Sequence, residues 1–276
     1  MLKKKIGFFI TSEEYLRNFV NSNIINQISK NFEVHIFLNE KIKIDKRKVK
    51  NCKSISKFSS SSNEKSHQYW NLIKIWKYRD KAKSFEARVL EHFRIDSKRF
   101  KKNKNNDFYF NFRNLISVIS FSKDLIKFLV LNFLSYGFFF RIFKSFYIKK
   151  LLINQSLLNC INKKKIDLII NPTSAHNSET IDLIKIGKIK KIQSLLIIDN
   201  WDNLSSKIFF DEKPDHIFCW GEQSVIHGKK IHGFKKNIKS IGSARFDLYF
   251  KKRKLKQKTK LKEKHVLFLG SSLKWN

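Results

Sequence analysis

The chain has 276 residues, of which 58 are Lys or Arg and 23 are Asp or Glu, so its formal net charge is +35. Its three cysteines are far apart and show no CxxC spacing, which argues against a disulfide framework and a cysteine-based zinc site and favours a reducing cytoplasm. The charge would attract anionic lipids, sugar nucleotides or nucleic acid, but the lysines are spread over nearly every segment and no RNP, zinc-finger or helix-turn-helix signature accompanies them.

The first elements are predicted to form a strand, helix, strand unit. Three lysines precede the apolar run Ile6–Ile10, which is too short for the hydrophobic core of a signal peptide and is interpreted as a strand. Thr11 and Glu14 are spaced as a capping box, and apolar residues at helical spacing then predict one helix up to about Asn31. Apolar residues alternate with polar ones over much of Phe32–Leu38, which predicts the second strand. A GxGxxG dinucleotide fingerprint is absent.

A long helical insertion is predicted next. The polar stretch Asn39–Lys65 is interpreted as mostly loop. From about residue 64 to residue 163 there is no proline and a single glycine, and aromatic-rich amphipathic segments predict helices. Within them, Phe128–Phe140 is strongly apolar with basic flanks but shorter than the roughly 20 residues of a spanning helix. Two alternatives remain, a buried core helix and an interfacial helix whose flanks meet anionic phospholipid headgroups.

Further apolar runs, each followed by small or polar residues, predict parallel strands that are buried on both faces. The fold class predicted from this order is therefore α/β, with a Rossmann-like, doubly wound parallel sheet. These runs are Ile166–Ile170, Leu195–Ile198, His216–Trp220 and Ile238–Ile241.

The segments that follow the predicted strands carry the candidate functional residues. Ligands of an open parallel sheet bind at the carboxyl ends of its strands. We therefore expect five of these segments to lie along one edge of the sheet. They are residues 11–14, 171–177, 199–203, 221–223 and 242–245.

The order of motifs resembles the end of the N-terminal domain in GT-B glycosyltransferases, and most closely that of enzymes of bacterial surface-polysaccharide assembly and CDP-glycerol glycerophosphotransferases. Pro214–Glu222 matches a strand and its following turn, and Gly233 matches the end of the next helix. Gly242–Asp247 matches the G-x-x-x-F-D run that closes the first Rossmann-like domain of this group, and Gly270–Ser272 the Gly-Ser loop that opens its donor-binding domain. Asp199–Leu204 is similar to a motif of uncharacterised proteins from such polysaccharide clusters.

This resemblance implies an enzyme that transfers a glycosyl group from a nucleotide sugar to a polysaccharide or lipid-linked acceptor at the cytoplasmic face of the membrane. It implies an acceptor-side domain over residues 1–250, a linker over 251–264 and the start of a second Rossmann domain over 265–276, so the chain alone is expected to be inactive. Enzymes of this group hold the leaving diphosphate with helix N-termini and basic side chains. The nucleotide sugar is then a co-substrate, and neither a cofactor nor a metal is expected.

Glycosyl transfer needs a base for the acceptor hydroxyl and donors for the departing diphosphate. His176, Asp199 and Asp202 are the candidate catalytic residues, although His176 also fits a loop histidine without a role and the aspartates fit caps of backbone amides. No third ligand accompanies the two aspartates, which argues against a metal site. The candidate substrate-binding residues are Glu13, Trp201, Asn203, Glu222 and Arg245, and the candidate donor-phosphate residues are Gly270, Ser271 and Ser272.

Several of these predictions keep an alternative. Trp201 could stack on a sugar or, as we favour, plug the edge of the domain. Arg245, a rare arginine among lysines, indicates a bidentate partner, which is a phosphate or, as we favour, a carboxylate of the fold such as Asp247. A CDP-glycerol-type glycerophosphotransferase would share the fold and differ in its donor. A non-catalytic nucleic-acid-binding protein with a basic, aromatic surface is the alternative of another class.

Overall fold

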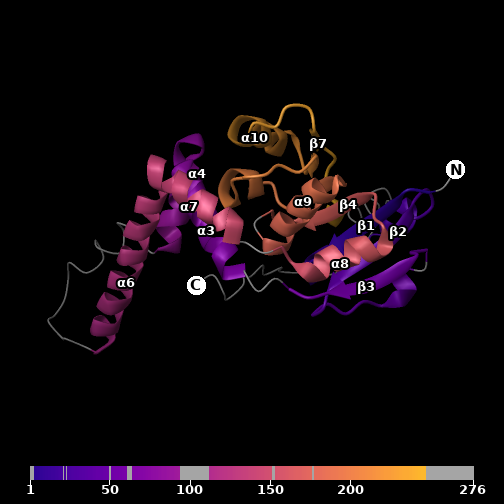
Figure 1. Ribbon diagram of the computed structural model, residues 1–276, viewed down its shortest axis with the longest axis horizontal. Helices are drawn as coiled ribbons and strands as arrows, with labels where there is room; N and C mark the ends of the chain where they lie inside the picture. Colours follow the sequence, from indigo (N-terminus) through magenta and orange to yellow (C-terminus); the bar gives the residue numbers. More distant parts are fainter. Residues whose placement is uncertain are drawn as a thin grey trace, which may run out of the picture. The chain divides into compact units, whose positions relative to one another are not determined.

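The structure is a computed structural model in which the chain divides into two units, Met1–Arg245 and Phe246–Asn276. Of the second unit, only Phe246 is described. The first unit is an α/β domain whose helices flank a parallel sheet (Figure 1). The described residues are 3–20, 22, 24–49, 51–60, 64–93, 112–150, 153–175 and 177–246.

The described part of the chain contains one sheet of seven parallel strands, in the order β3-β2-β1-β4-β5-β6-β7. The chain therefore builds the sheet outward in two directions from the neighbouring pair β1 and β4, which is the pattern of a doubly wound sheet. This confirms the predicted Rossmann-like fold. The strands are β1 (Lys5–Ile10), β2 (Glu33–Asn39), β3 (Ser54–Phe58), β4 (Leu168–Thr173), β5 (Gln193–Ile198), β6 (His216–Cys219) and β7 (Ile238–Ser240).

Helices cover both faces of the sheet because side chains alternate along each strand. On one face, Phe8 of β1 packs in a core cluster with Phe19, and on the other Phe9 packs with Leu157. The first face is covered by the segment after β1, and the second by the helices on either side of β4. These elements are α1 (Glu13–Tyr15), the π-helical turn η1 (Leu16–Val20), α2 (Ile24–Ile28), α8 (Gln155–Lys164) and α9 (Ser178–Lys190).

The described part of the predicted insertion between β3 and β4 consists mainly of helices. Its helices bury an aromatic cluster that includes Trp70, Phe85 and Phe140. None of the described helices is by itself long and apolar enough to cross a membrane, whereas Lys123–Ser135 and Gly137–Tyr147, bent by 94°, meet that criterion as a pair. The helices of the insertion before α8 are α3 (Glu64–Lys77), the 3-10 turn η3 (Arg79–Lys81), α4 (Lys83–His92), α6 (Phe112–Ser135) and α7 (Gly137–Lys150).

Two sequence predictions about the strands are wrong in detail. The stretch Asn39–Lys65 is not only loop, because it contains the 3-10 turn η2 (Lys46–Val49) and the edge strand β3, whose partly exposed residues give it a polar sequence. The predicted polar tip after β4 begins too early, because Asn171 and Thr173 are fully buried inside the strand. The Nδ2 of Asn171 donates to the carbonyl of Phe9 at 3.2 Å, next to Pro172, which has no amide hydrogen to donate.

The helix after β1 also differs from its prediction. Its N-cap is Ser12, whose Oγ accepts from the amide of Tyr15, so the predicted capping box at Thr11 is displaced by one residue. The single helix expected up to Asn31 is divided into α1, η1 and α2. Widened π turns of this kind often accompany functional sites, because they reorient a few side chains within an otherwise regular helix.

Candidate functional site

The carboxyl edge of the sheet is the candidate site. Because β1, β4, β5, β6 and β7 are parallel and adjacent, the segments after them emerge along the same edge, and the predicted convergence of these five segments is confirmed. The order of the strands reverses between β1 and β4, which is where ligands of doubly wound sheets bind. Two segments of this edge are π-helical turns, η1 after β1 and η4 (Asn203–Lys207) after β5.

A network of short polar side chains fixes the two loops at the reversal point. Asn177 donates through Nδ2 to Thr11 Oγ1 at 3.2 Å, which ties the loop after β4 to the end of β1. The hydroxyl of Thr173 donates to Asn177 Oδ1 at 2.9 Å and accepts from the amide of Ala175 at 2.8 Å. Ala175 is fully buried with a φ of 73°, a left-handed conformation that is costly for a residue with a Cβ. The loop is therefore held in one strained shape.

Asp199 follows β5 immediately and lies within this edge with only 6 % of its surface exposed. Asn18, from the π-helical turn η1, donates through Nδ2 to Asp199 Oδ1 at 3.4 Å. Burial raises the pKa of the Asp199 carboxyl, the nearby Glu14 raises it further, and Arg245 opposes both. A carboxyl group whose pKa lies above its ordinary value is a better proton acceptor, which is the property a general base needs.

Tyr15 and the Glu14–Arg245 ion pair accompany Asp199. Tyr15 is buried, and burial raises the pKa of its phenol to about 12, although hydrogen bonding with Ser174 opposes the shift. Arg245 Nη2 lies 2.5 Å from Glu14 Oε1, so the segment after β7 is joined to the helix after β1. The partner of the rare arginine is thus a carboxylate of the fold, and that carboxylate is Glu14.

The predicted residues of the 199–203 loop differ in exposure. Asp202 accepts from Ser206 Oγ at 3.2 Å and lies 3.5 Å from Lys207 Nζ, contacts that fix the η4 turn. Trp201 is 55 % exposed, so the favoured interpretation, that it plugs the edge of the domain, is wrong. Asn203 is fully buried, and neither polar atom of its side chain has a hydrogen-bond partner among the residues that the structure describes. The loop turns Trp201 outward because Asn203 and Leu204 occupy its interior.

The remaining predicted site residues are either exposed at helix starts or lie outside the described residues. Glu13 and Glu222 are exposed in the first turns of α1 and α10 (Glu222–His232), where a carboxylate interacts favourably with the helix dipole. His176, Asp247 and the predicted donor-phosphate loop Gly270–Ser272 lie outside the described residues.

Sequence reasoning missed the side chains that surround Asp199. Tyr15 and Asn18 stand in a segment that reads as the buried face of an ordinary helix, and their contacts depend on the π-helical turn. One signal was present, since Asn18 is a polar residue directly beside the apolar Phe19 and Val20. Such a residue inside a buried helical segment needs a polar partner, and here the partner is Asp199.

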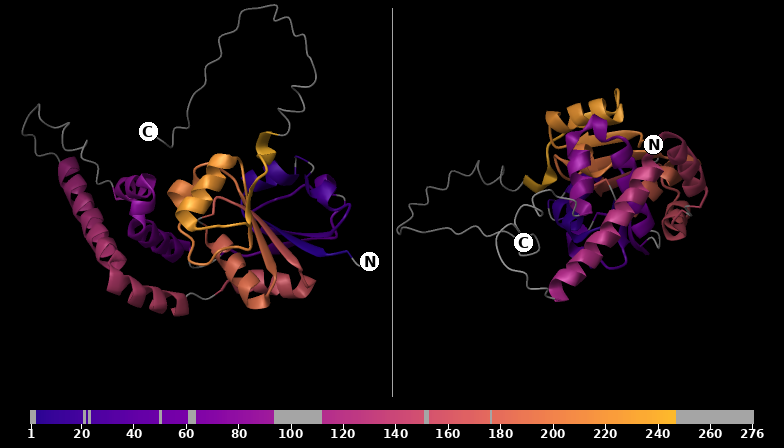
Figure 2. Two further views of the ribbon diagram at one scale, coloured as in Figure 1. Left: turned by 90° about the horizontal axis from the view of Figure 1, so that it is seen from above. Right: turned by 90° about the vertical axis from the view of Figure 1, so that its left-hand side faces the viewer.

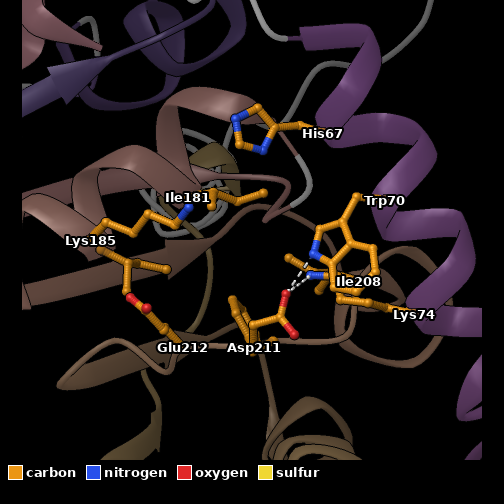
Figure 3. A pocket seen from close by; sticks show the side chains of 10 residues that line it. His67, Trp70, Lys74, Ile181, Lys185, Ile208, Asp211 and Glu212 are labelled. Carbon is orange, nitrogen blue, oxygen red and sulfur yellow. Dashed lines mark hydrogen bonds and ion pairs between the residues drawn. The ribbon is translucent and has the colours of Figure 1, made fainter. Parts of the chain in front are cut away.

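A second polar cluster lies away from this edge, between α3, α9 and the segment before β6 (Figure 3). Lys74 is 2 % exposed, and its ammonium group lies 3.0 Å from Asp211 Oδ2, which also accepts from Trp70 Nε1 at 2.8 Å.

Beside this ion pair is a cavity of about 30 Å³, large enough for one or two waters. His67 lines the cavity, and neither of its ring nitrogens has a hydrogen-bond partner in the described part of the chain. Burial lowers the pKa of His67 to about 4, so the ring is neutral near pH 7.

Asp182 of α9 is a further buried carboxyl group, 1 % exposed. Its Oδ2 has no hydrogen-bond partner among the residues that the structure describes. Burial raises the pKa of Asp182 to about 7, against the opposing effects of Lys185 and of the backbone amide of Asn154.

Comparisons with known proteins add no assignment, since neither a protein-family model nor a curated protein matches the chain. Within the described ranges, no group of three or more His, Cys, Asp or Glu side chains is placed to hold a metal ion.

Proposed function

We propose that this domain is the acceptor-side half of a nucleotide-sugar-dependent glycosyltransferase, which acts on a polysaccharide or lipid-linked acceptor at the cytoplasmic face of a membrane in bacterial cell-surface glycan synthesis. The observation that carries the proposal is the position of Asp199. It is a buried carboxyl group with a raised pKa at the carboxyl edge of a doubly wound sheet, two strands from β1 and next to β4. The resemblance of the strand-end motifs to GT-B enzymes supports the reaction class.

In the proposed reaction, the acceptor hydroxyl lies at the carboxyl edge and gives its proton to a carboxylate oxygen of Asp199. The acceptor oxygen then bonds to the anomeric carbon as the bond from that carbon to the phosphate oxygen breaks, and the nucleoside diphosphate leaves. Asn18 keeps Asp199 Oδ1 oriented, and Tyr15 and the Glu14–Arg245 pair close the site from the side of α1. A second α/β domain, which the resemblance places from residue 265 onward, would hold the donor.

A donor screen tests the proposed class. The chain, expressed with any coding sequence that continues past codon 276, is incubated with UDP-glucose, UDP-N-acetylglucosamine, GDP-mannose or CDP-glycerol and with lipid-linked or polysaccharide acceptors. We expect a sugar nucleotide to release its nucleoside diphosphate only when an acceptor is present, and mass spectrometry to show the acceptor with one added sugar.

Other outcomes of the screen would contradict glycosyl transfer. If CDP-glycerol is the one donor in the screen that reacts, and it releases CMP, the enzyme is a glycerophosphotransferase instead. If no donor reacts and labelled single-stranded nucleic acid binds in a salt-dependent manner, the non-catalytic alternative is correct.

A further inference from the structure

Helix α6 has two apolar faces. Its inner face includes Leu131, which is fully buried in the aromatic cluster of the insertion. On its outer face, apolar residues recur at positions i, i+3, i+4 and i+7, and each of these residues is 46–60 % exposed. A surface helix of a globular domain needs one apolar stripe, so the second indicates a partner that is not part of the described chain. The outer residues are Ile126, Leu129, Val130 and Phe133.

The exposed apolar surface continues around the bend into α7. Tyr136, Phe138 and Ile142 are 73 %, 66 % and 52 % exposed. Figures 1 and 2 show α6 and α7 running along the outside of the described chain. We call these three residues and the four outer residues of α6 the apolar corner. Exposed apolar residues also occur outside these two helices, and two of them, Ile189 of α9 and Ile226 of α10, come from different elements.

Basic groups border the apolar corner. Lys123, Lys127 and Arg141 are exposed on α6 and α7 themselves. At the bend, an open groove of about 900 Å³ is lined on one side by Tyr136 and Gly137. Its other lining residues include three cations and two carboxylates, and no carboxylate of the described chain forms an ion pair with any of the three cations. The three are Lys77, Arg79 and Lys83.

We propose that the apolar corner docks on a bilayer that contains anionic phospholipids. The apolar side chains would insert at the boundary between headgroups and acyl chains, and the bordering cations would contact headgroup phosphates. Charge favours this occupant over a second copy of the chain, because two copies would bring together two molecules with a net charge of +35 each. The apolar content likewise disfavours nucleic acid, whose backbone is recognised by charge. The proposal does not depend on transferase activity.

Sedimentation with sucrose-loaded vesicles tests the proposal, using the full chain and vesicles of phosphatidylcholine with or without an equal part of phosphatidylglycerol. We expect binding to the anionic vesicles that weakens with salt. A variant with Ile126→Gln, Phe133→Gln and Phe138→Gln should lower the partition coefficient by about tenfold or more, because it removes apolar surface that would leave water. The matched control, Ile189→Gln with Ile226→Gln, replaces equally exposed residues outside the corner and should bind like the wild type.

A second variant addresses the cations separately. Lys77→Gln with Lys83→Gln should weaken binding to the anionic vesicles and reduce its salt dependence. Circular dichroism and thermal melting of every variant check that the fold is kept. The proposal is overturned if the wild type does not sediment with anionic vesicles or if the triple variant binds as tightly. It is also overturned if light scattering shows a dimer that the triple variant converts to a monomer, since a second copy would then cover the corner.

Discussion

Replacing Asp211 by asparagine is expected to destabilise the chain by about 3–5 kcal/mol, because it leaves a buried ammonium group without its counter-charge. Lys74 is the group concerned, with its Nζ 3.0 Å from Asp211 Oδ2. Burial lowers the pKa of Lys74, and Asp211 is the main influence that keeps it charged. Asparagine still accepts a hydrogen bond from Trp70 Nε1, so the change removes charge with little loss of volume. Urea denaturation monitored by circular dichroism measures the effect.

The double variant Lys74→Met with Asp211→Asn separates the ionic account from a packing defect. It removes the charges of Lys74 and Asp211, and it leaves Lys144, whose Nζ lies 3.4 Å from Asp211 Oδ1 in the wild type but is partly exposed to water. We expect it to recover most of the lost stability, since a buried ion pair can often be replaced by apolar groups at little cost. Asp45→Asn is the control, because the Asp45–Arg47 pair lies at the surface and should contribute little. A double variant as unstable as Asp211→Asn alone would contradict the ionic account.

The change in unfolding free energy caused by Asp182→Asn is expected to be more favourable at pH 8 than at pH 5. The difference between the two pH values should be about 2–3 kcal/mol. Asp182 has a pKa of about 7 in the folded chain, against about 3.9 in an unfolded one. The folded state therefore holds the proton more tightly, and wild-type stability falls as the pH rises from about 3.9 to about 7, then levels off. Asparagine carries no charge to bury, and its oxygen can still accept from the backbone amide of Asn154.

Denaturant midpoints of wild type and Asp182→Asn at the two pH values measure this difference. Asp45→Asn serves again as the control, because a surface carboxyl group should show no comparable change between pH 5 and pH 8. An equal effect of Asp182→Asn at both pH values would mean that the carboxyl group is already ionised in the folded state at pH 5, contrary to its burial.

The sheet was predictable because its strands are buried on both faces and therefore read as continuous apolar runs. The strand that sequence reasoning missed, β3, is an edge strand with three polar residues out of five, a composition that also fits a loop. The end of β4 was misjudged for a related reason. Asn171 and Thr173 are polar but buried. Asn171 donates to Phe9, which is 162 residues away, so no local pattern identifies its partner. Thr173 bonds to Asn177 four residues later, and the sequence alone does not distinguish this contact from that of an exposed turn.

The sequence was sufficient to predict the carboxyl edge and the position of Asp199 on it. Parallel strands fix where their following segments emerge, so the convergence of the five segments follows from the strand order alone. The side chains that give Asp199 its properties were not predictable, because Asn18 and Glu14 meet it across 181 and 185 residues of sequence. Likewise, nothing local shows that Trp201 points outward while Asn203 is buried.

The most direct test of the proposed site is the turnover of Asp199→Asn, measured with the donor and acceptor that the screen identifies. Asparagine keeps the size of the side chain and its contact with Asn18 but cannot take up a proton at neutral pH. We expect the transfer rate at saturating acceptor to fall by about 100-fold or more, with unchanged thermal stability or a small gain, whereas Asp45→Asn keeps the wild-type rate. A folded Asp199→Asn variant that turns over at the wild-type rate would contradict the assignment of Asp199 as the general base.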